Sequence, residues 1–245
     1  MNFYSVIIGT ELLNGRRKDA HFSFLNKELL KRGWEQKASF VIKDDPSFME
    51  DIYRLIKNDP DAVMFSFGGI GSTPDDFTRV CAANVFTNGK MEEHKIAKQR
   101  ILDKFGEESY PHRITMAHLP INAGLLHNVV NNIPGFSLEN KYFFTPGFPS
   151  MSQSMIVEAL DKYYPKNKEK FRYFLKAYCS ENELIDVMKK IPKDIDFSSL
   201  PHIENEKRTV VISVGSYDKV EAEHYFNLFV DMLNEKKIEF ILEDS

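Results

Sequence analysis

The chain has 245 residues, of which 42% are hydrophobic, and a formal net charge of −4. This length allows one large domain or two smaller ones. The slightly acidic balance argues against nucleic acid as a partner, because nucleic-acid-binding proteins usually carry a basic surface. No apolar run approaches the roughly 20 residues that a bilayer-spanning helix needs. Neither cysteine belongs to a CxxC or metal-binding spacing. We therefore expect a cytoplasmic protein with reduced thiols and no membrane partner.

The first part of the chain alternates strand patterns with helix patterns. The expected strands are 3–8, 34–42 and 61–66, and the expected helices are 20–30, 45–58 and 77–85. Alternating strands and helices are typical of a parallel sheet covered on both faces. The sequence therefore predicts an α/β fold with three layers, in which a mostly parallel sheet has helices on both faces.

The pattern changes after a further expected helix at 92–104. Residues 110–149 are rich in Pro, Gly and Asn and predict loops with two or three short strands, followed by a helix at 151–163. Pro165 and the Lys-rich run after it mark a boundary between domains 1–165 and 166–245. The second domain is predicted as a small α+β domain. Its expected strands are 171–179, 208–214 and 238–242, its expected helices are 181–190 and 218–235, and a loop holds Pro192 and Pro201.

A glycine-rich loop from Gly68 to Thr78 lies between an expected strand and an expected helix. Such a loop lets backbone amides approach an anion, and the helix N-terminus adds its positive dipole end. Asp75 and Asp76 fall where the loop meets the helix. Carboxylates beside a phosphate site commonly hold Mg²⁺ or a similar ion. Asp at a helix start also caps backbone amides, so the alternative for one of the pair is that it acts as a cap and nothing more. The hydroxyls of Thr73 and Thr78 can reach phosphate or backbone.

Two further turns are expected at the same edge of the sheet, because ligands of doubly wound sheets bind beyond the carboxyl ends of the strands. The first strand ends in the segment 9–15, where Glu11 can accept a proton, help to hold a metal, or cap the helix. Arg16 follows as a phosphate partner or a surface charge. The third turn, 145–150, repeats the order of strand, glycine turn and helix, with Ser150 as a candidate cap.

Taken together, these stretches resemble the MoaB/Mog-type molybdopterin-binding domain family, and most of all the N-terminal part of the competence/damage-inducible protein A (CinA) family. The matching stretches are Gly9-Thr10-Glu11-Leu12-Leu13, Gly15, Asp19, 68–78, 116–120, Asn128, 134–136 and 146–149. The resemblance covers about residues 3–160. Residues 168–245 resemble the small domain that follows in CinA-type chains, and no part resembles the amidase domain that many of them carry.

The resemblance implies a domain that binds a phosphorylated pterin or nucleotide, with molybdopterin or a precursor as a ligand, and it implies a homo-oligomer. In CinA-like proteins it also implies hydrolysis of a pyrophosphate bond in ADP-ribose-like substrates with Mg, Mn or Co. The residues carried over as catalytic are Glu11, Asp75 and Asp76, the last two also as metal ligands. The residues carried over as ligand-binding are Gly9, Thr10, Gly15, Arg16, Gly68, Gly69, Gly71, Ser72, Thr73, Thr78, Pro146 and Gly147.

The chain departs from the family pattern at several positions. Thr10, Ser72 and Met151 stand in place of Asp, Pro and Glu, and Asn131 stands where the family often has Gly. The loss of two carboxylates lowers the negative charge available to a metal. Three hypotheses therefore stay open: a metal-dependent pyrophosphatase, a non-catalytic binding protein for cofactor handling, and an assembly domain with a vestigial site.

Overall fold

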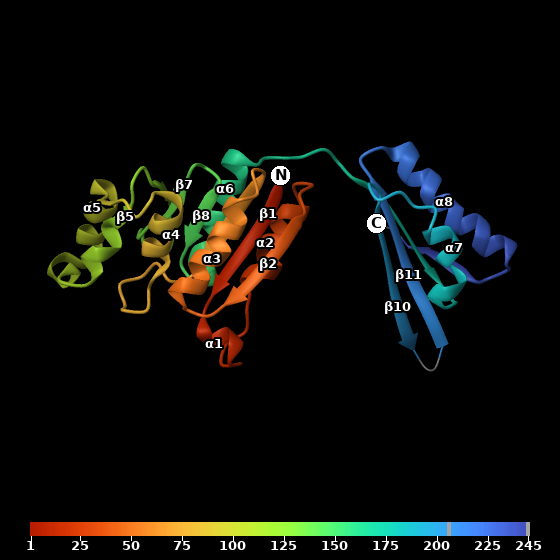
Figure 1. Cartoon of the computed structure of the whole chain (residues 1–245), viewed down its shortest axis with the longest axis horizontal. Coiled ribbons are helices and arrows are strands. Elements are labelled where there is room, and N and C mark those ends of the chain that lie inside the picture. Colours follow the sequence, from red (N-terminus) through yellow and green to blue (C-terminus); the bar gives the residue numbers. More distant parts are fainter. Residues whose placement is uncertain (205–206, 244–245) are drawn as a thin grey trace. The chain divides into compact units, whose positions relative to one another are not determined.

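The computed structural model describes residues 1–204 and 207–243 and divides into two compact units, Met1–Asn167 and Lys168–Ser245 (Figure 1). The sheet of the first unit has the strand order β2-β1-β3-β8-β7-β6. Its strands are β1 (Asn2–Ile8), β2 (Gln36–Ile42), β3 (Ala62–Phe67), β6 (Gly124–Leu126), β7 (Gly135–Leu138) and β8 (Tyr142–Thr145). The first four strands in this order are parallel, β7 pairs with β8 in the antiparallel sense, and β6 pairs with β7 in the antiparallel sense. The predicted α/β fold with a mostly parallel sheet is confirmed.

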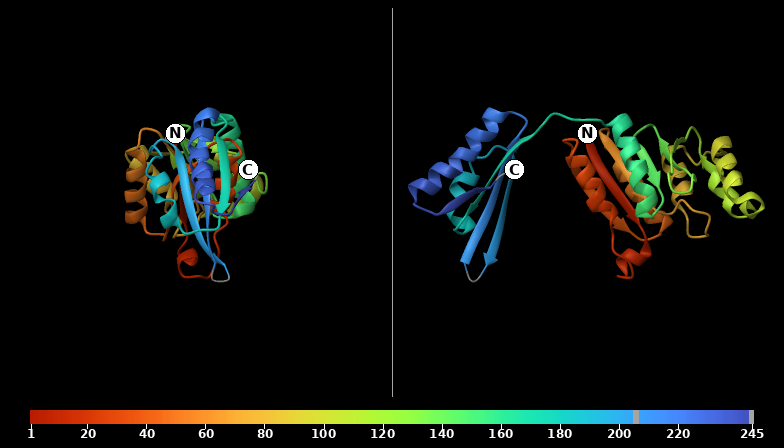
Figure 2. Two further views of the ribbon diagram at one scale, coloured as in Figure 1. Left: turned by 90° about the vertical axis from the view of Figure 1, so that its right-hand side faces the viewer. Right: turned by 180° about the vertical axis from the view of Figure 1, so that it is seen from behind.

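Helices cover both faces of this sheet (Figures 1 and 2). On one face lie α2 (His21–Leu30) and α6 (Pro149–Tyr163), and on the other lie α3 (Pro46–Lys57) and α4 (Thr78–Phe86). Strand β1 shows why the layers form: Phe3 and Ile7 join the core beneath α2 and α6, whereas Val6 and Ile8 join the core beneath α3 and α4. A strand that is apolar on both faces is stable only between two helical layers.

The segment between α4 and β6 forms a small excursion from the sheet. It contains β4 (Met91–Glu93), α5 (Lys95–Phe105), two 3-10 turns (Gly106–Ser109 and Arg113–Ala117) and β5 (His118–Pro120), which pairs with β4. The expected helix at 92–104 therefore starts too early. His94 follows the strand and caps the helix, because its Nδ1 accepts a hydrogen bond from the Ala97 N–H at 3.3 Å. Residues 110–149 contain four short strands, one more than the most we expected.

Gly135 in β7 offers a test of this packing. A Cβ added there would lie 2.5 Å from the carbonyl oxygen of Phe144 and 2.9 Å from Sδ of Met155. We expect Gly135→Ala to lower the free energy of unfolding by about 1–3 kcal/mol, the usual cost of overpacking. In the matched control, Gly124→Ala, the added Cβ meets mainly the Ser137 hydroxyl, at 2.8 Å, which can rotate away. Urea denaturation measures both, and equal losses would contradict this description of the core.

The second unit is an antiparallel sheet of order β10-β11-β9-β12 with helices packed on one face. Its elements are β9 (Phe171–Ala177), a 3-10 turn (Glu181–Glu183), α7 (Ile185–Met188), β10 (Asp196–Glu204), β11 (Lys207–Ser216), α8 (Lys219–Glu235) and β12 (Phe240–Glu243). The loop expected around Pro201 is wrong, because Pro201 lies in β10 opposite Val210. In the described sheet β10 is an edge strand, and an edge strand tolerates a residue without an N–H. The helix expected at 181–190 is reduced to the 3-10 turn and α7.

Among the described residues, no helix combines the length and the apolar character needed to cross a bilayer.

Candidate functional site

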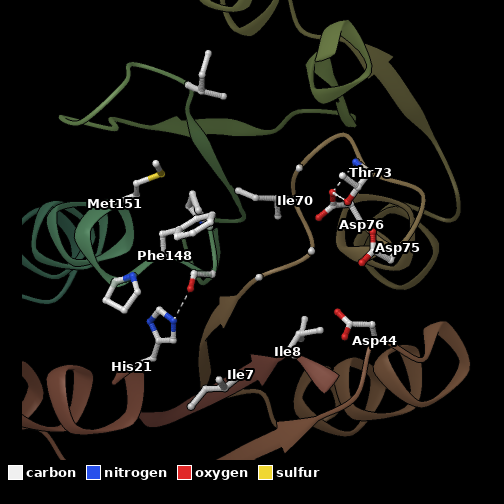
Figure 3. Close-up of a pocket in the computed structure, with 18 of the residues that line it drawn as sticks. Ile7, Ile8, His21, Asp44, Ile70, Thr73, Asp75, Asp76, Phe148 and Met151 are labelled. Carbon is white, nitrogen blue, oxygen red and sulfur yellow. Dashed lines mark hydrogen bonds between the residues drawn. The ribbon is translucent and has the colours of Figure 1, made fainter. Parts of the chain in front are cut away.

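Three turns meet beyond the carboxyl ends of β1, β3 and β8 around a cavity of about 580 Å³ (Figure 3). The Gly68 N–H donates to the Thr145 carbonyl oxygen at 2.9 Å, which joins the start of the glycine loop to the end of β8. A Cβ on Gly147 would lie 3.4 Å from the Gly68 Cα, so the two turns pack against each other. The predicted site residues that line the cavity are Gly9, Glu11, Gly68, Gly69, Gly71, Ser72, Thr73, Asp75, Asp76, Pro146 and Gly147.

Thr78, the first residue of α4, fixes the start of the glycine loop. Gly68 and Gly69 have φ values of 100° and 67°, a region that glycine enters without strain. The fully buried Thr78 donates from its hydroxyl to the Gly68 carbonyl oxygen at 2.9 Å and from its N–H to the Gly69 carbonyl oxygen at 3.0 Å. The Thr78 hydroxyl therefore bonds to backbone. A side chain at Gly69 would disturb this clamp, because its Cβ would lie 2.4 Å from Thr78 Oγ1.

The next part of the loop presents backbone N–H groups without partners. Within the described chain, the N–H groups of residues 69–72 donate to no protein acceptor. The carbonyl oxygens of Ile70 and Gly71 both accept from Nη1 of Arg79. In a trans peptide the N–H points opposite to the C=O, so the N–H groups of Gly71 and Ser72 point away from this guanidinium. Consecutive free amides beside a cavity are suited to bind an anion.

The two aspartates of the loop have different surroundings. Asp76 Oδ2 accepts from the Thr73 N–H at 2.7 Å and from its hydroxyl at 2.6 Å, so Asp76 closes the turn. Asp75, by contrast, is exposed. Asp44 lies on the same side of the pocket, across from Met151 (Figure 3). Its Oδ2 accepts from the N–H and the hydroxyl of Thr10, each at 2.8 Å.

These contacts decide how the pocket could hold a divalent ion. The described residues contain no group of three or more His, Cys, Asp or Glu side chains arranged around a common metal position. Asp76 and Asp44 each use Oδ2 to accept two hydrogen bonds, from Thr73 and from Thr10. Asp44 keeps Oδ1 for an ion, and Asp75 lies exposed beside the loop. They fit an ion such as Mg²⁺, which binds through one or two carboxylates together with the phosphates of its ligand, and they do not form an all-protein cage.

Arg17 and His21, which follow the turn at 9–15, contact the turn at 145–150. Arg17 Nη2 donates to the Gly147 carbonyl oxygen at 2.7 Å, and its Nη1 lies 3.4 Å from Oε1 of Glu11. His21 is buried, with Nε2 at 3.2 Å from the same carbonyl oxygen and Nδ1 at 3.3 Å from the Ser152 hydroxyl. Burial lowers the pKa of His21. A neutral ring that donates from Nε2 and accepts at Nδ1 satisfies both contacts.

Four predicted ligand residues lie outside the cavity lining: Thr10, Gly15, Arg16 and Thr78. Thr10 and Thr78 bond to Asp44 and to the loop backbone, as described above. Arg16 is exposed and donates to the Asn14 side chain at 3.1 Å. Gly15 has a φ of 78° and serves the turn. Ser150 is not the cap of α6, because that helix already begins at Pro149.

Other residues of the lining were not among the predicted site residues. They include Arg17, Lys18, Asp19, His21, Asp44, Arg113, Asn128, Asn131 and an apolar group made of Phe105, Met116, Ile133, Phe148 and Met151. Asp44 had a signal in the sequence, because it closely follows the strand expected at 34–42 and so lies at the same edge of the sheet. Asn128 is 1% exposed, and its Nδ2 has no partner among the described residues.

The buried histidine predicts a pH dependence of stability. The unfolded chain binds a proton at the ordinary His pKa of 6.5, whereas folded His21 binds it only at lower pH. Lowering the pH through 6.5 therefore favours the unfolded state, and the free energy of unfolding should fall below that pH. His21→Gln should weaken this decline, whereas His127→Gln, at an exposed position, should leave it unchanged. Urea denaturation between pH 5 and 8 measures the slopes; an unchanged slope in His21→Gln would contradict the assignment.

Comparison with known proteins identifies a family match that coincides with the first compact unit, Met1–Asn167. A family model described as "Probable molybdopterin binding domain" matches residues 5–166. A CinA-like protein of Fusobacterium nucleatum is 25% identical over 233 residues, which are 87% of this chain and 57% of that relative, so this chain spans little more than half of its length. A protein of Sulfolobus acidocaldarius is 24% identical over 253 residues, 96% of this chain and 94% of the relative.

A solved structure shows the same fold. The crystal structure of the protein CinA from Thermoplasma acidophilum, described as of unknown function, matches with a TM-score of 0.59 and 26% identity over 66% of this chain and 98% of that one. The family model covers well over half of the chain and includes all three turns of the pocket. This chain therefore belongs to the molybdopterin-binding domain family and resembles its CinA-like members.

Proposed function

We propose that the cavity binds a phosphorylated small molecule of the pterin or nucleotide class, with its phosphate at the N–H groups of residues 69–72. The observation that carries this proposal is the row of four backbone amides without protein acceptors in the described chain, beside an open cavity. Such amides give charge-assisted hydrogen bonds to an oxyanion. The same feature explains why the loop needs glycines at positions 68 and 69, where φ is positive.

The other end of the cavity is suited to a flat ring. It is lined by the apolar group Phe105, Met116, Ile133, Phe148 and Met151. Figure 3 places Met151 and Phe148 opposite the loop that carries Thr73 and Asp76. Aromatic and thioether side chains pack well against a heteroaromatic face. A volume of about 580 Å³ is within the usual range for small-molecule sites. The description of the matching family supports molybdopterin or a precursor as the ligand.

Hydrolysis of a pyrophosphate bond in an ADP-ribose-like substrate is the second candidate. It is favoured by the two carboxylates, Asp44 and Asp75, that border the anion-binding loop. An ion held there with the ligand phosphates would polarise a phosphoryl oxygen and lower the pKa of a bound water. The chain's own contribution would be the loop amides, which stabilise charge on the phosphate. Glu11 lines the same cavity, and its carboxylate contacts Arg17.

Thermal denaturation with a ligand panel tests the proposal. The panel contains pyrophosphate, ADP-ribose and a phosphorylated pterin, each with EDTA, Mg²⁺, Mn²⁺ or Co²⁺. A ligand at 100 times its Kd should stabilise the folded chain by about 2.7 kcal/mol. Release of AMP from ADP-ribose would select the enzyme, and binding without product would select the binding protein. If no phosphorylated ligand shifts the transition, the proposal fails and the vestigial assembly domain is favoured.

Self-association and a cytoplasmic location are further parts of this proposal. The family resemblance supports self-association, and the cytoplasmic location is the expectation from the sequence given above. Light scattering of the purified chain measures the first, and cell fractionation measures the second. A mass equal to that of one chain, 28.4 kDa, at all concentrations would reject the oligomer.

A further inference from the structure

Arg79 is a buried cation directly behind the glycine loop. It is the second residue of α4 and is only 9% exposed. Its Nη1 donates to the carbonyl oxygens of both Ile70 and Gly71. Nη1 can donate to both because it carries two N–H groups, and the guanidinium keeps its charge. The side chain thus holds two successive peptide groups of the loop in one orientation.

The charge of Arg79 has no close carboxylate partner within the part of the chain that the structure describes. No Asp or Glu there forms an ion pair with it within 4.0 Å. Asp76 interacts electrostatically with Arg79 without forming an ion pair. The Asp76 carboxylate accepts hydrogen bonds from Thr73 instead. Glu93 lines a second pocket together with Arg79, but it pairs with Lys98 at 2.8 Å. Burial accordingly lowers the pKa of Arg79.

A buried charge without a partner is costly, and the cost falls when an opposite charge comes close. The cavity on the other side of the loop offers that place. Since the carbonyls of Ile70 and Gly71 point toward Arg79, the N–H groups of Gly71 and Ser72 point the opposite way. An anion that accepts from these amides is separated from the guanidinium only by the loop backbone, in a region of reduced dielectric where charges interact more strongly than in water.

We propose that Arg79 is a positioning residue for anion binding: it orients the loop amides from behind, and the ligand's phosphate group acts as its counter-ion across the loop. This inference rests on the function proposed above. It adds that the site discriminates between ligands by their charge. Part of the preference for pyrophosphate over inorganic phosphate therefore comes from the charge of Arg79, and not only from the additional hydrogen bonds that a larger anion makes. It also assigns a binding role to a residue outside the lining of the cavity.

The test compares the pyrophosphate and phosphate affinities of the wild type, Arg79→Met and Arg79→Lys by calorimetric titration. Arg79→Met keeps an apolar stem and removes the charge. We expect it to weaken pyrophosphate binding by roughly tenfold or more and to lower the ratio of pyrophosphate to phosphate affinity. Arg79→Lys keeps the charge but changes the length and shape of the side chain that orients the two carbonyls, so both affinities should fall while their ratio stays near the wild-type value.

A control variant separates the loss of charge at Arg79 from a general loss of stability. Arg32→Met removes a partly buried arginine that pairs with Glu28 and Asp161, away from the cavity, and should cost stability without changing either affinity. Equal affinities in Arg79→Met and wild type, or loss of both anions by one common factor, would overturn the inference. If Arg79→Met does not fold, the ratio in Arg79→Lys decides, and a ratio well below the wild-type value overturns it. A wild type that binds neither anion would instead reject the proposed function itself.

Discussion

Replacing Gly69 with alanine is expected to reduce the affinity for pyrophosphate by about 100-fold or more, the equivalent of losing two hydrogen bonds to a charged group. Gly69 has a φ of 67°, and an added Cβ would lie 2.4 Å from Oγ1 of Thr78. Either the loop or Thr78 must move. Both movements disturb the bond from the Thr78 hydroxyl to the Gly68 carbonyl, which sets the direction of the amides that follow.

Gly15→Ala is the matched control for this change. Gly15 also has a positive φ, 78°, but a Cβ there would meet nothing within 4 Å. The variant should therefore show the conformational cost alone, about 1–2 kcal/mol of stability, with unchanged affinity. It also tests the role as a ligand residue that the sequence suggested for Gly15. Calorimetric titration and urea denaturation together measure both variants. Unchanged affinity in Gly69→Ala, or equal losses in the two variants, would contradict the role of the loop.

Substitutions of the adjacent aspartates Asp75 and Asp76 should change the affinity for pyrophosphate in opposite directions when EDTA is present. Asp76→Ala leaves the N–H and hydroxyl of Thr73 without their acceptor. We expect a loss of about 1–2 kcal/mol of stability, as for a lost cap, and a marked loss of affinity for pyrophosphate. Asp76→Asn retains one oxygen acceptor and should lose less of both. Urea denaturation and titration with pyrophosphate follow the series.

Asp75→Asn should behave differently, because Asp75 is exposed and its carboxylate lies beside the proposed phosphate position. In EDTA the variant should bind pyrophosphate a few-fold more tightly, since one repelling charge is gone. In Mg²⁺ the same variant should bind more weakly than the wild type if an ion is held there with the phosphates. A weaker affinity in EDTA would show that Asp75 stabilises the anion in some other way and would contradict this assignment.

The position of the pocket could be predicted from the sequence because parallel strands end at one edge of a sheet. The turns that begin at residues 9, 68 and 145, each after a strand, therefore had to lie near one another, whatever the details of their side chains. The fold class was predicted from the alternation of strand and helix patterns, which is typical of a parallel sheet covered by helices on both faces. Backbone geometry in the glycine loop followed from the glycines themselves.

The individual side chains could not be predicted in the same way. Arg16 and Arg17 are neighbours, and only the turn at Gly15 decides that Arg17 reaches Gly147, 130 residues along the chain, while Arg16 faces solvent. The hydroxyl of Thr78 had two plausible partners, and the path of the loop selects the backbone. Pro201 suggested a loop because the sequence does not show that β10 is an edge strand. Each of these depends on contacts between distant segments.

The most direct measurement of the central claim is a titration of the ¹⁵N-labelled chain with pyrophosphate, followed by amide NMR. If the loop amides are the anion receptor, the N–H signals of Gly69, Ile70, Gly71 and Ser72 should shift with one common affinity and become protected from exchange with solvent. Binding that leaves these four signals unmoved, while other amides of the cavity shift, would contradict the account.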